Sequence, residues 1–177
     1  MRYTGIKKHL KPYSIASRKS TIAHAFASAI APHDEFDDET AREAIFCLGQ
    51  DPDRDLRCAY CDADAKSWDH VNGIVKSKRF SGYGHRIGNL LPCCEFCNSA
   101  KGNLDWKTYM SKIDMPEKKK CKQISVIQSY LDRFLVSDIL PEECPEIDEM
   151  EEIKEQIIEL MVKADGVASI LRTRLAR

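Results

Sequence analysis

The chain lacks several features that define common protein classes. Its 177 residues contain no apolar run long enough to span a membrane, no internal repeat and no low-complexity tract. The net charge is also close to zero, at −1. These absences exclude a membrane-spanning protein and a repeat architecture. The length favours one domain, or one domain with a helical appendage, and the ordinary apolar content allows a buried core without disulfides.

The small net charge hides an uneven distribution of charged residues along the chain. Residues 1–33 contain six basic residues and no acidic one, whereas residues 141–159 contain nine acidic residues and one lysine. The basic arm suits a polyanion such as nucleic acid, and the acidic block suits a solvated helix or a basic partner. Further basic residues gather in the middle of the chain, at Lys76, Lys78, Arg79, Lys101, Lys107, Lys118, Lys119 and Lys120.

Eight cysteines are many for this length, but their spacing is not that of a disulfide framework. Four form two CxxC pairs, and the others show no regular spacing. Paired cysteines beside basic segments are typical of an intracellular metal site. Thr21–Ala31 mimics the apolar part of a signal peptide, but it is rich in alanine and carries His24. We therefore expect a cytoplasmic protein with no membrane association.

Helix breakers and apolar spacing predict an α+β chain that is mostly helical, in three regions. Residues 1–50 form an N-terminal helical region, with one helix between Pro12 and Pro32 and a second that Asp37 or Asp38 caps. Residues 51–110 form a small core in the order strand, loop, strand, helix. The loop is expected over Gly73–Asn89, and the helix over Asn98–Met110.

Residues 111–177 are expected to form two helices after the core. The final helix carries an apolar stripe whose spacings alternate between three and four residues, as in a coiled coil. This stripe predicts either a homodimer or a helix packed on its own chain, and we favour the dimer. Its members are Met150, Ile153, Ile157, Leu160, Ala164, Val167 and Leu171.

The two CxxC pairs predict a zinc site. Four thiolates are soft ligands that close a tetrahedral structural site, here from Cys58, Cys61, Cys94 and Cys97. Cys93 neighbours Cys94, but the two-residue spacing favours Cys94. The 32 residues between the pairs exceed what a plain zinc ribbon uses, and they contain Asp69 and His70.

Asp69 and His70 supply two kinds of chemistry from one short segment. Neighbouring residues on a strand point to opposite faces, so one can bind a metal while the other addresses a different atom. The oxygens of Asp69 and of Asn98, directly after the last cysteine, are hard ligands suited to Mg²⁺. Neutral His70 can accept a proton from water. Alone, an Asp-His pair is more often a surface pair or a helix cap.

Taken together, the pattern CAYC…WDHV…GNLLPCCEFCNSAKG resembles the HNH nuclease family, which has a ββα-metal core. The resemblance covers about residues 58–107, and it implies that Asp69 and Asn98 bind the catalytic metal and that His70 is the general base. It also implies that Asn89 braces the loop and orients the histidine, and that the four cysteines bind structural zinc. The Gly-Gly that often follows the first motif in this family is replaced here by Phe80-Ser-Gly-Tyr-Gly84.

The resemblance implies an endonuclease that hydrolyses phosphodiester bonds in double-stranded DNA with Mg²⁺ or Mn²⁺, in restriction or anti-phage defence. Two alternatives remain open: a nuclease subunit activated by a separate sensor protein, and a zinc-stabilised DNA-binding protein that does not cleave. The residues expected to contact DNA are Lys76, Lys78, Arg79, His85, Arg86 and Lys101.

Overall fold

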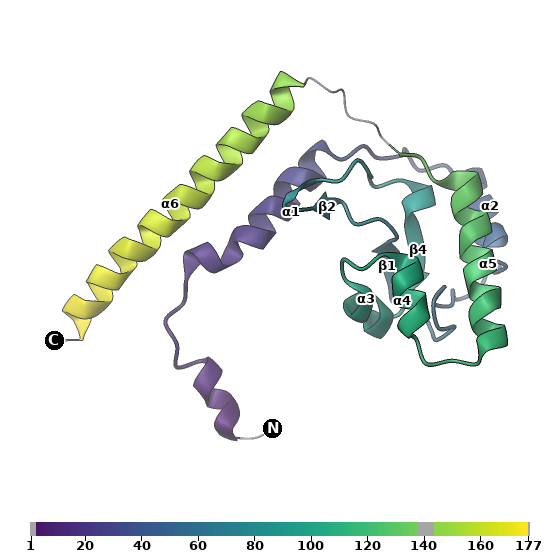
Figure 1. Ribbon diagram of the computed structural model, residues 1–177, viewed down its shortest axis with the longest axis horizontal. Coiled ribbons are helices and arrows are strands. Elements are labelled where there is room, and N and C mark those ends of the chain that lie inside the picture. Colours follow the sequence, from purple (N-terminus) through teal and green to yellow (C-terminus); the bar gives the residue numbers. More distant parts are fainter. Residues whose placement is uncertain (1–2, 138–143, 177) are drawn as a thin grey trace. The chain divides into compact units, whose positions relative to one another are not determined.

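The computed structural model describes residues 3–137 and 144–176 and shows an α+β protein in which helices predominate (Figure 1). The predicted fold class is confirmed at this level. The elements in chain order are η1 (Tyr3–Lys8), η2 (Ile15–Arg18), α1 (Lys19–Ile30), α2 (Asp38–Cys47), β1 (Ser67–His70), β2 (Val75–Lys76), β3 (Arg79–Phe80), η3 (Ile87–Asn89), β4 (Leu90–Cys93), α3 (Glu95–Lys101), α4 (Trp106–Lys112), α5 (Glu117–Phe134) and α6 (Pro145–Leu175). Within the described residues, no helix combines the length and the apolar character that crossing a membrane requires.

The chain divides into two compact units. We call Ala27–Glu142 the core unit, and Met1–Phe26 with Glu143–Arg177 the terminal unit. The predicted boundaries at residues 50 and 110 both fall inside the core unit. The predicted regions followed changes in composition, whereas the division in space follows packing.

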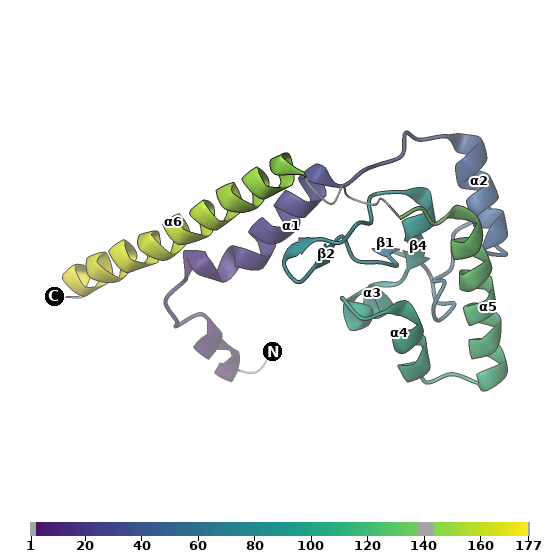
Figure 2. The ribbon, with the colours of Figure 1, turned by 45° about the horizontal axis from the view of Figure 1, so that its top comes forward.

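The core unit is built around an antiparallel pair of short strands, β1 and β4. Ser67 lies opposite Cys93 and His70 opposite Leu90. Helix α3 follows β4 and contacts β1, which completes a ββα arrangement, and α5 contacts both α2 and α4 (Figure 2). The buried apolar side chains at the centre come from α2, β4, α3, α4 and α5 and from the segments on either side of β1; they include Tyr60, Val71, Leu91, Met110, Ile127 and Tyr130.

Two glycines allow close approaches of backbone to backbone in the core unit. A Cβ atom on Gly84 would overlap the carbonyl oxygen of Pro32, and one on Gly88 would overlap that of Phe134. The Tyr130 hydroxyl contacts the carbonyl oxygens of Ile87 and Leu90. The Gly88 and Tyr130 contacts fasten the segment before β4 to α5, whereas Gly84 lies against the segment between α1 and α2.

Two predictions about the core unit were wrong. The expected loop over Gly73–Asn89 contains the β2–β3 hairpin, whose turn residues Ser77 and Lys78 have φ of 53° and 67°. Such a two-residue turn needs positive φ at both positions and normally signals itself by Asn or Gly. The expected helix over Asn98–Met110 is two helices, because Gly102 ends α3 with φ of 48° and Asp105 caps α4 through Thr108 N.

The N-terminal helices follow the sequence signals more closely. Asp37 caps α2 by accepting a hydrogen bond from Thr40 N at 2.8 Å, as one of the two predicted caps. Gly49, with φ of 71°, follows that helix. The helix expected between Pro12 and Pro32 begins later, with the short η2 turn before α1.

In the terminal unit, α6 packs on η2. Asp165 accepts hydrogen bonds from Ser14 Oγ, Ile15 N and Ala16 N at 2.6, 2.8 and 3.0 Å. Its carboxylate therefore caps η2 from a distant part of the chain, although η2 has no capping bond from its own N-cap side chain.

Candidate metal centre and active site

The four predicted zinc cysteines lie together at one end of the ββα arrangement. Their Sγ atoms are all within 4.8 Å of one another, and those of Cys61 and Cys94 are 3.7 Å apart. Zinc bound at about 2.3 Å to four sulfurs would place them about 3.8 Å apart. The cluster therefore fits a tetrahedral metal ion, as the two CxxC pairs predicted.

Local backbone geometry fixes both cysteine turns. Cys58 N donates to Ala63 O at 2.7 Å and Asp62 N to Cys58 O at 2.8 Å, which closes the first turn. Asp62 has φ of 68°. In the second turn Cys94 is the N-cap of α3, and its sulfur accepts from Cys97 N at 3.4 Å.

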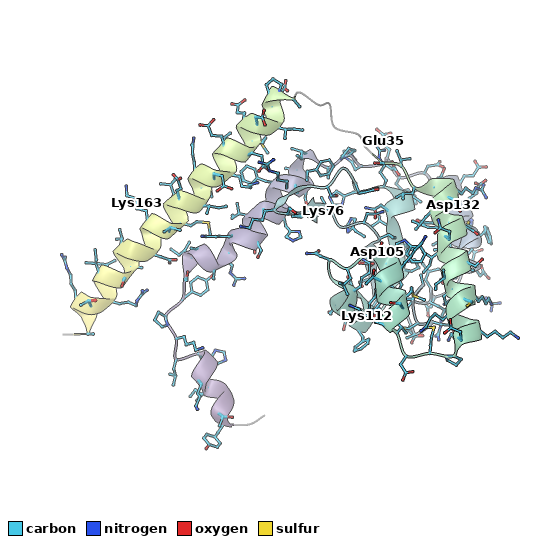
Figure 3. The ribbon with its side chains drawn as sticks, viewed as in Figure 1. Glu35, Lys76, Asp105, Lys112, Asp132 and Lys163 are labelled. Atoms are coloured by element: carbon cyan, nitrogen blue, oxygen red, sulfur yellow. The ribbon has the colours of Figure 1, made fainter. Side chains whose placement is uncertain are left out.

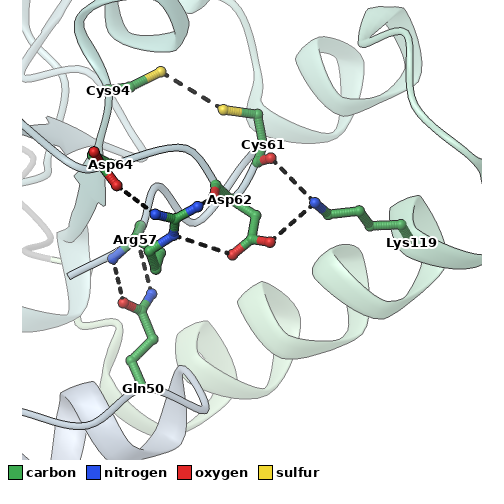
Figure 4. A network of polar contacts seen from close by, with 7 residues as sticks. All are labelled: Gln50, Arg57, Cys61, Asp62, Asp64, Cys94 and Lys119. Atoms are coloured by element: carbon green, nitrogen blue, oxygen red, sulfur yellow. Dashed lines mark hydrogen bonds and ion pairs between the residues drawn. The ribbon is translucent and has the colours of Figure 1, made fainter. Parts of the chain in front are cut away.

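A polar network holds the first cysteine turn to the turn after α2 and to α5 (Figure 4). Arg57 forms ion pairs with Asp62 and Asp64, and its backbone exchanges two hydrogen bonds with the Gln50 side chain. Lys119 of α5 reaches Asp62 at 3.0 Å and Cys61 O at 3.5 Å. Contacts of this kind, one layer behind the ligands, fix ligand orientation in metal sites.

The thiols differ in acidity. The hydrogen-bond contact with the Cys93 sulfur lowers the pKa of Cys58 well below its usual value, whereas burial raises the pKa of Cys61 and of Cys97. Cys93 is buried 4.0 Å from Cys58 and lies outside the four-sulfur cluster. A dication stabilises thiolates that burial otherwise disfavours, so the donor set suits a bound zinc.

The side chain of Asp69, on β1, is buried on the side facing α3, and both of its carboxylate oxygens have polar partners. Tyr60 donates its hydroxyl to one oxygen at 2.6 Å. Lys101 Nζ lies 3.0 and 3.2 Å from the two oxygens and 2.9 Å from His70 O. Burial raises the pKa of Asp69, and the Tyr60 hydrogen bond and the Lys101 charge oppose that rise.

Lys101 was expected to contact a DNA phosphate, and this prediction was wrong. Its side chain is 1% exposed, because α3 turns it inward onto Asp69. Lys101 is three residues after Asn98, and this spacing places both on the same face of a helix. That spacing is the sequence signal that could have placed the lysine inside. Tyr60, between the first two cysteines, was also missed.

Asn98 lies on the same strand–helix interface as Asp69. Its Nδ2 donates to Ser67 Oγ at 3.0 Å, and Ser67 and Asp69 are alternate residues on one face of β1. A carboxylate and an amide oxygen are hard donors of the kind that Mg²⁺ prefers. The Lys101 ammonium already neutralises the carboxylate, so a metal ion would share Asp69 with it.

His70 points from the other face of β1. Its Nε2 is 3.1 Å from Nδ1 of His85, which lies in the segment before η3. Burial lowers the pKa of His70 to about 4, and the nearby positive charges of His85 and Lys101 contribute. His70 is therefore neutral at pH 7, the form that a general base requires.

Asn89 joins the two ends of the segment between β1 and β4 by hydrogen bonds. Its Oδ1 accepts from Asn72 N at 2.9 Å, while its Nδ2 donates to Asn72 O at 3.0 Å and to Gly84 O at 3.1 Å. Its backbone oxygen accepts from Val71 N at 2.9 Å. Val71 directly follows His70 and Gly84 directly precedes His85, so Asn89 fixes the backbone beside both histidines.

The remaining predicted DNA contacts lie in two places. Lys76, Lys78 and Arg79 are exposed on the β2–β3 hairpin, where Figure 3 labels Lys76. Arg86 is partly buried and forms an ion pair with Asp34 at 2.8 Å. The structure thus separates an exposed basic hairpin from a basic residue that anchors a loop.

Comparison of the chain with protein-family models, with curated proteins and with solved structures gave no match.

Proposed function

We propose that this chain is a metal-dependent endonuclease of the HNH, ββα-metal type, which hydrolyses phosphodiester bonds in double-stranded DNA. The observation that carries the proposal is the ββα arrangement beside the cysteine cluster. It sets Asp69 on β1 and Asn98 on α3 at one interface and turns His70 to the other face of the strand.

In this mechanism His70 removes a proton from the attacking water. The His70–His85 contact needs one hydrogen between the two rings. If His70 Nε2 donates it, the lone pair of His70 is on Nδ1, which then accepts the proton from water. His85 is thereby a positioning residue for the base.

The site around Asp69 would stabilise the negative charge that develops on the phosphate during cleavage. Asp69 and Asn98 would hold a Mg²⁺, which would supply positive charge where negative charge develops during the cleavage. Lys101 and Tyr60 hold the carboxylate in one orientation. The hairpin residues Lys76, Lys78 and Arg79 supply salt-sensitive contacts to the DNA backbone.

The zinc has a different task from the magnesium. Four thiolates leave no open position, so zinc in this site is structural. We propose a cytoplasmic location, where reduced thiols persist, and a role in restriction or anti-phage defence, for which the support is the resemblance of the motifs.

Purified protein incubated with supercoiled plasmid and Mg²⁺ tests the activity. Discrete linear fragments support restriction, and nicking or smearing supports a nuclease without sequence preference. An intact plasmid with Mg²⁺ and with Mn²⁺ would contradict the proposal for the isolated chain and favour the subunit or binding alternatives.

We also propose a homodimer formed through α6. Three of the seven residues of the apolar stripe are partly buried, at Met150, Ile157 and Ala164. The other four remain 40–63% exposed, at Ile153, Leu160, Val167 and Leu171. Two active sites related by a two-fold axis suit cleavage of both DNA strands. Light scattering that gives the mass of one chain at micromolar concentration, with and without DNA, contradicts the dimer.

A further inference from the structure

An open cavity of about 430 Å³ lies on the core unit beside the His70–His85 pair. Its floor is apolar and is made by Ala44 and Ile45 of α2 together with Ile87 and Tyr130. Two aromatic rings stand at its mouth, and both are exposed: Trp68 at 51% and Phe36 at 82%.

The cavity adjoins the proposed catalytic base. His85 lines it and contacts His70. Trp68 and His70 are alternate residues of β1, so their side chains leave the same face of the strand, roughly 6.6 Å apart along it. A nucleotide whose phosphate lies at His70 can therefore place its base near Trp68.

Charged groups of both signs line the cavity. Glu35 (labelled in Figure 3), Asp38 and Arg42 come from α2 and the segment before it. Asp34 also lines the cavity and forms an ion pair with Arg86, the residue after His85. Carboxylates accept hydrogen bonds from the amino groups of a base, whereas imidazole and guanidinium groups favour a phosphate.

We propose that this cavity takes one unstacked nucleobase next to the cleaved phosphate, with the base stacked on Trp68 and Phe36. The substrate is then DNA with an unpaired or flipped-out nucleotide. Flat exposed rings are what single bases stack on, and this interaction tolerates any base. The inference rests on the proposed nuclease function.

The test measures binding apart from cleavage. The full-length, zinc-loaded His70→Ala protein, without added Mg²⁺, is titrated with a short duplex that carries one unpaired adenine and with the fully paired duplex. Indole fluorescence reports the contact, because the other tryptophan, Trp106, is buried and gives a constant background. We expect quenching and tighter binding with the unpaired adenine.

Substitutions then assign the preference to the cavity. Binding of the variants is measured by fluorescence anisotropy of a dye-labelled duplex, because Trp68→Leu removes the reporting indole. Trp68→Leu and Phe36→Leu should each reduce the preference for the unpaired duplex by about 5-fold to 150-fold, the range for one base–aromatic stack. Phe46→Leu is the matched control: Phe46 is an exposed residue of α2 that does not line the cavity, so the preference should persist.

The outcomes separate this inference from the function on which it rests. Equal binding of the two duplexes, or a preference that survives both Trp68→Leu and Phe36→Leu, overturns the base site, while plasmid cleavage by the wild-type protein still supports the nuclease. Absence of binding to either duplex, together with absence of cleavage, overturns both. Quenching by an apolar peptide with no effect of either duplex assigns the cavity to a protein partner and also overturns the base site.

Discussion

The core unit and the terminal unit bury polar groups in different ways. In the core unit, Asp69, Asn89 and Lys101 are all buried, and each makes hydrogen bonds to specific partners. Both clusters of buried apolar side chains found among the described residues also lie there. The terminal unit is dominated by one long helix with many exposed apolar residues. Of the four buried polar side chains among the described residues, three thus lie in the unit that carries the candidate site, and the fourth, Lys154, lies in α6.

Removing one zinc ligand should produce the largest difference between the units. Cys97→Ser should leave the core unit unfolded or insoluble, because structural zinc contributes on the order of 10–16 kcal/mol in small zinc-binding peptides. The matched control is Cys144→Ser in the terminal unit, next to the start of α6, which should fold and keep about one zinc per chain. Elemental analysis and circular dichroism check both. A folded Cys97→Ser variant that retains activity would contradict the structural zinc.

Two buried lysines allow a matched comparison of charge burial. Lys101 and Lys154 are each 2% exposed, but Lys101 pairs with a buried carboxylate, whereas the Glu151 partner of Lys154 is 25% exposed. Lys101→Met should cost about 3–5 kcal/mol of unfolding free energy, because it leaves Asp69 buried without its cation. Lys154→Met should cost much less, because Glu151 remains in contact with water. Denaturant unfolding measures both, and equal losses would contradict the contrast.

The lowered pKa of His70 should make the core unit sensitive to acid. The unfolded chain protonates this histidine near pH 6.5, and the folded one only near pH 4. Between these values the unfolded state binds more protons, so stability falls as the pH falls and is regained as the pH rises to 6.5. Thermal unfolding of wild type and of His70→Gln, both without Mg²⁺, should show a shallower loss for the variant over this range. Parallel curves would mean that burial does not lower this pKa.

The smallest effect is expected in the terminal unit. Hydrogen bonds from Ser14, Ala16 and Ile15 lower the pKa of Asp165, so its cap is present at neutral pH and is lost only as the pH falls below the usual Asp range. Asp165→Asn should speed hydrogen exchange at residues 14–18 and leave the melting of the core unit unchanged. A shift in core melting would show that the two units do not behave separately.

The sequence predicted the cysteine cluster well because metal ligands obey fixed spacing. Cys58, Cys61, Cys94 and Cys97 come together as the two CxxC pairs required. The cap of α2 was also readable, since Asp37 lies directly before the helix. These are local signals, in which residue type and spacing determine the geometry.

Other features depended on contacts between distant residues and were missed or misplaced. The inward turn of Lys101 depends on a carboxylate 32 residues away, and the cap of η2 depends on Asp165, about 150 residues from its partners. The β2–β3 hairpin was missed because its turn uses Ser77 and Lys78 where glycine or asparagine is usual.

The rate of DNA cleavage by His70→Ala tests the central claim most directly. With supercoiled plasmid and Mg²⁺ at pH 7.5, loss of the general base should lower the rate by about 10²–10⁴-fold. Zinc content and DNA binding should stay at the wild-type level, because the base acts in the transition state. A variant that retains more than about a tenth of the wild-type rate would have lost less than about 10-fold, which is too little for the removal of a general base. That result would contradict the assignment of His70 and the nuclease mechanism built on it.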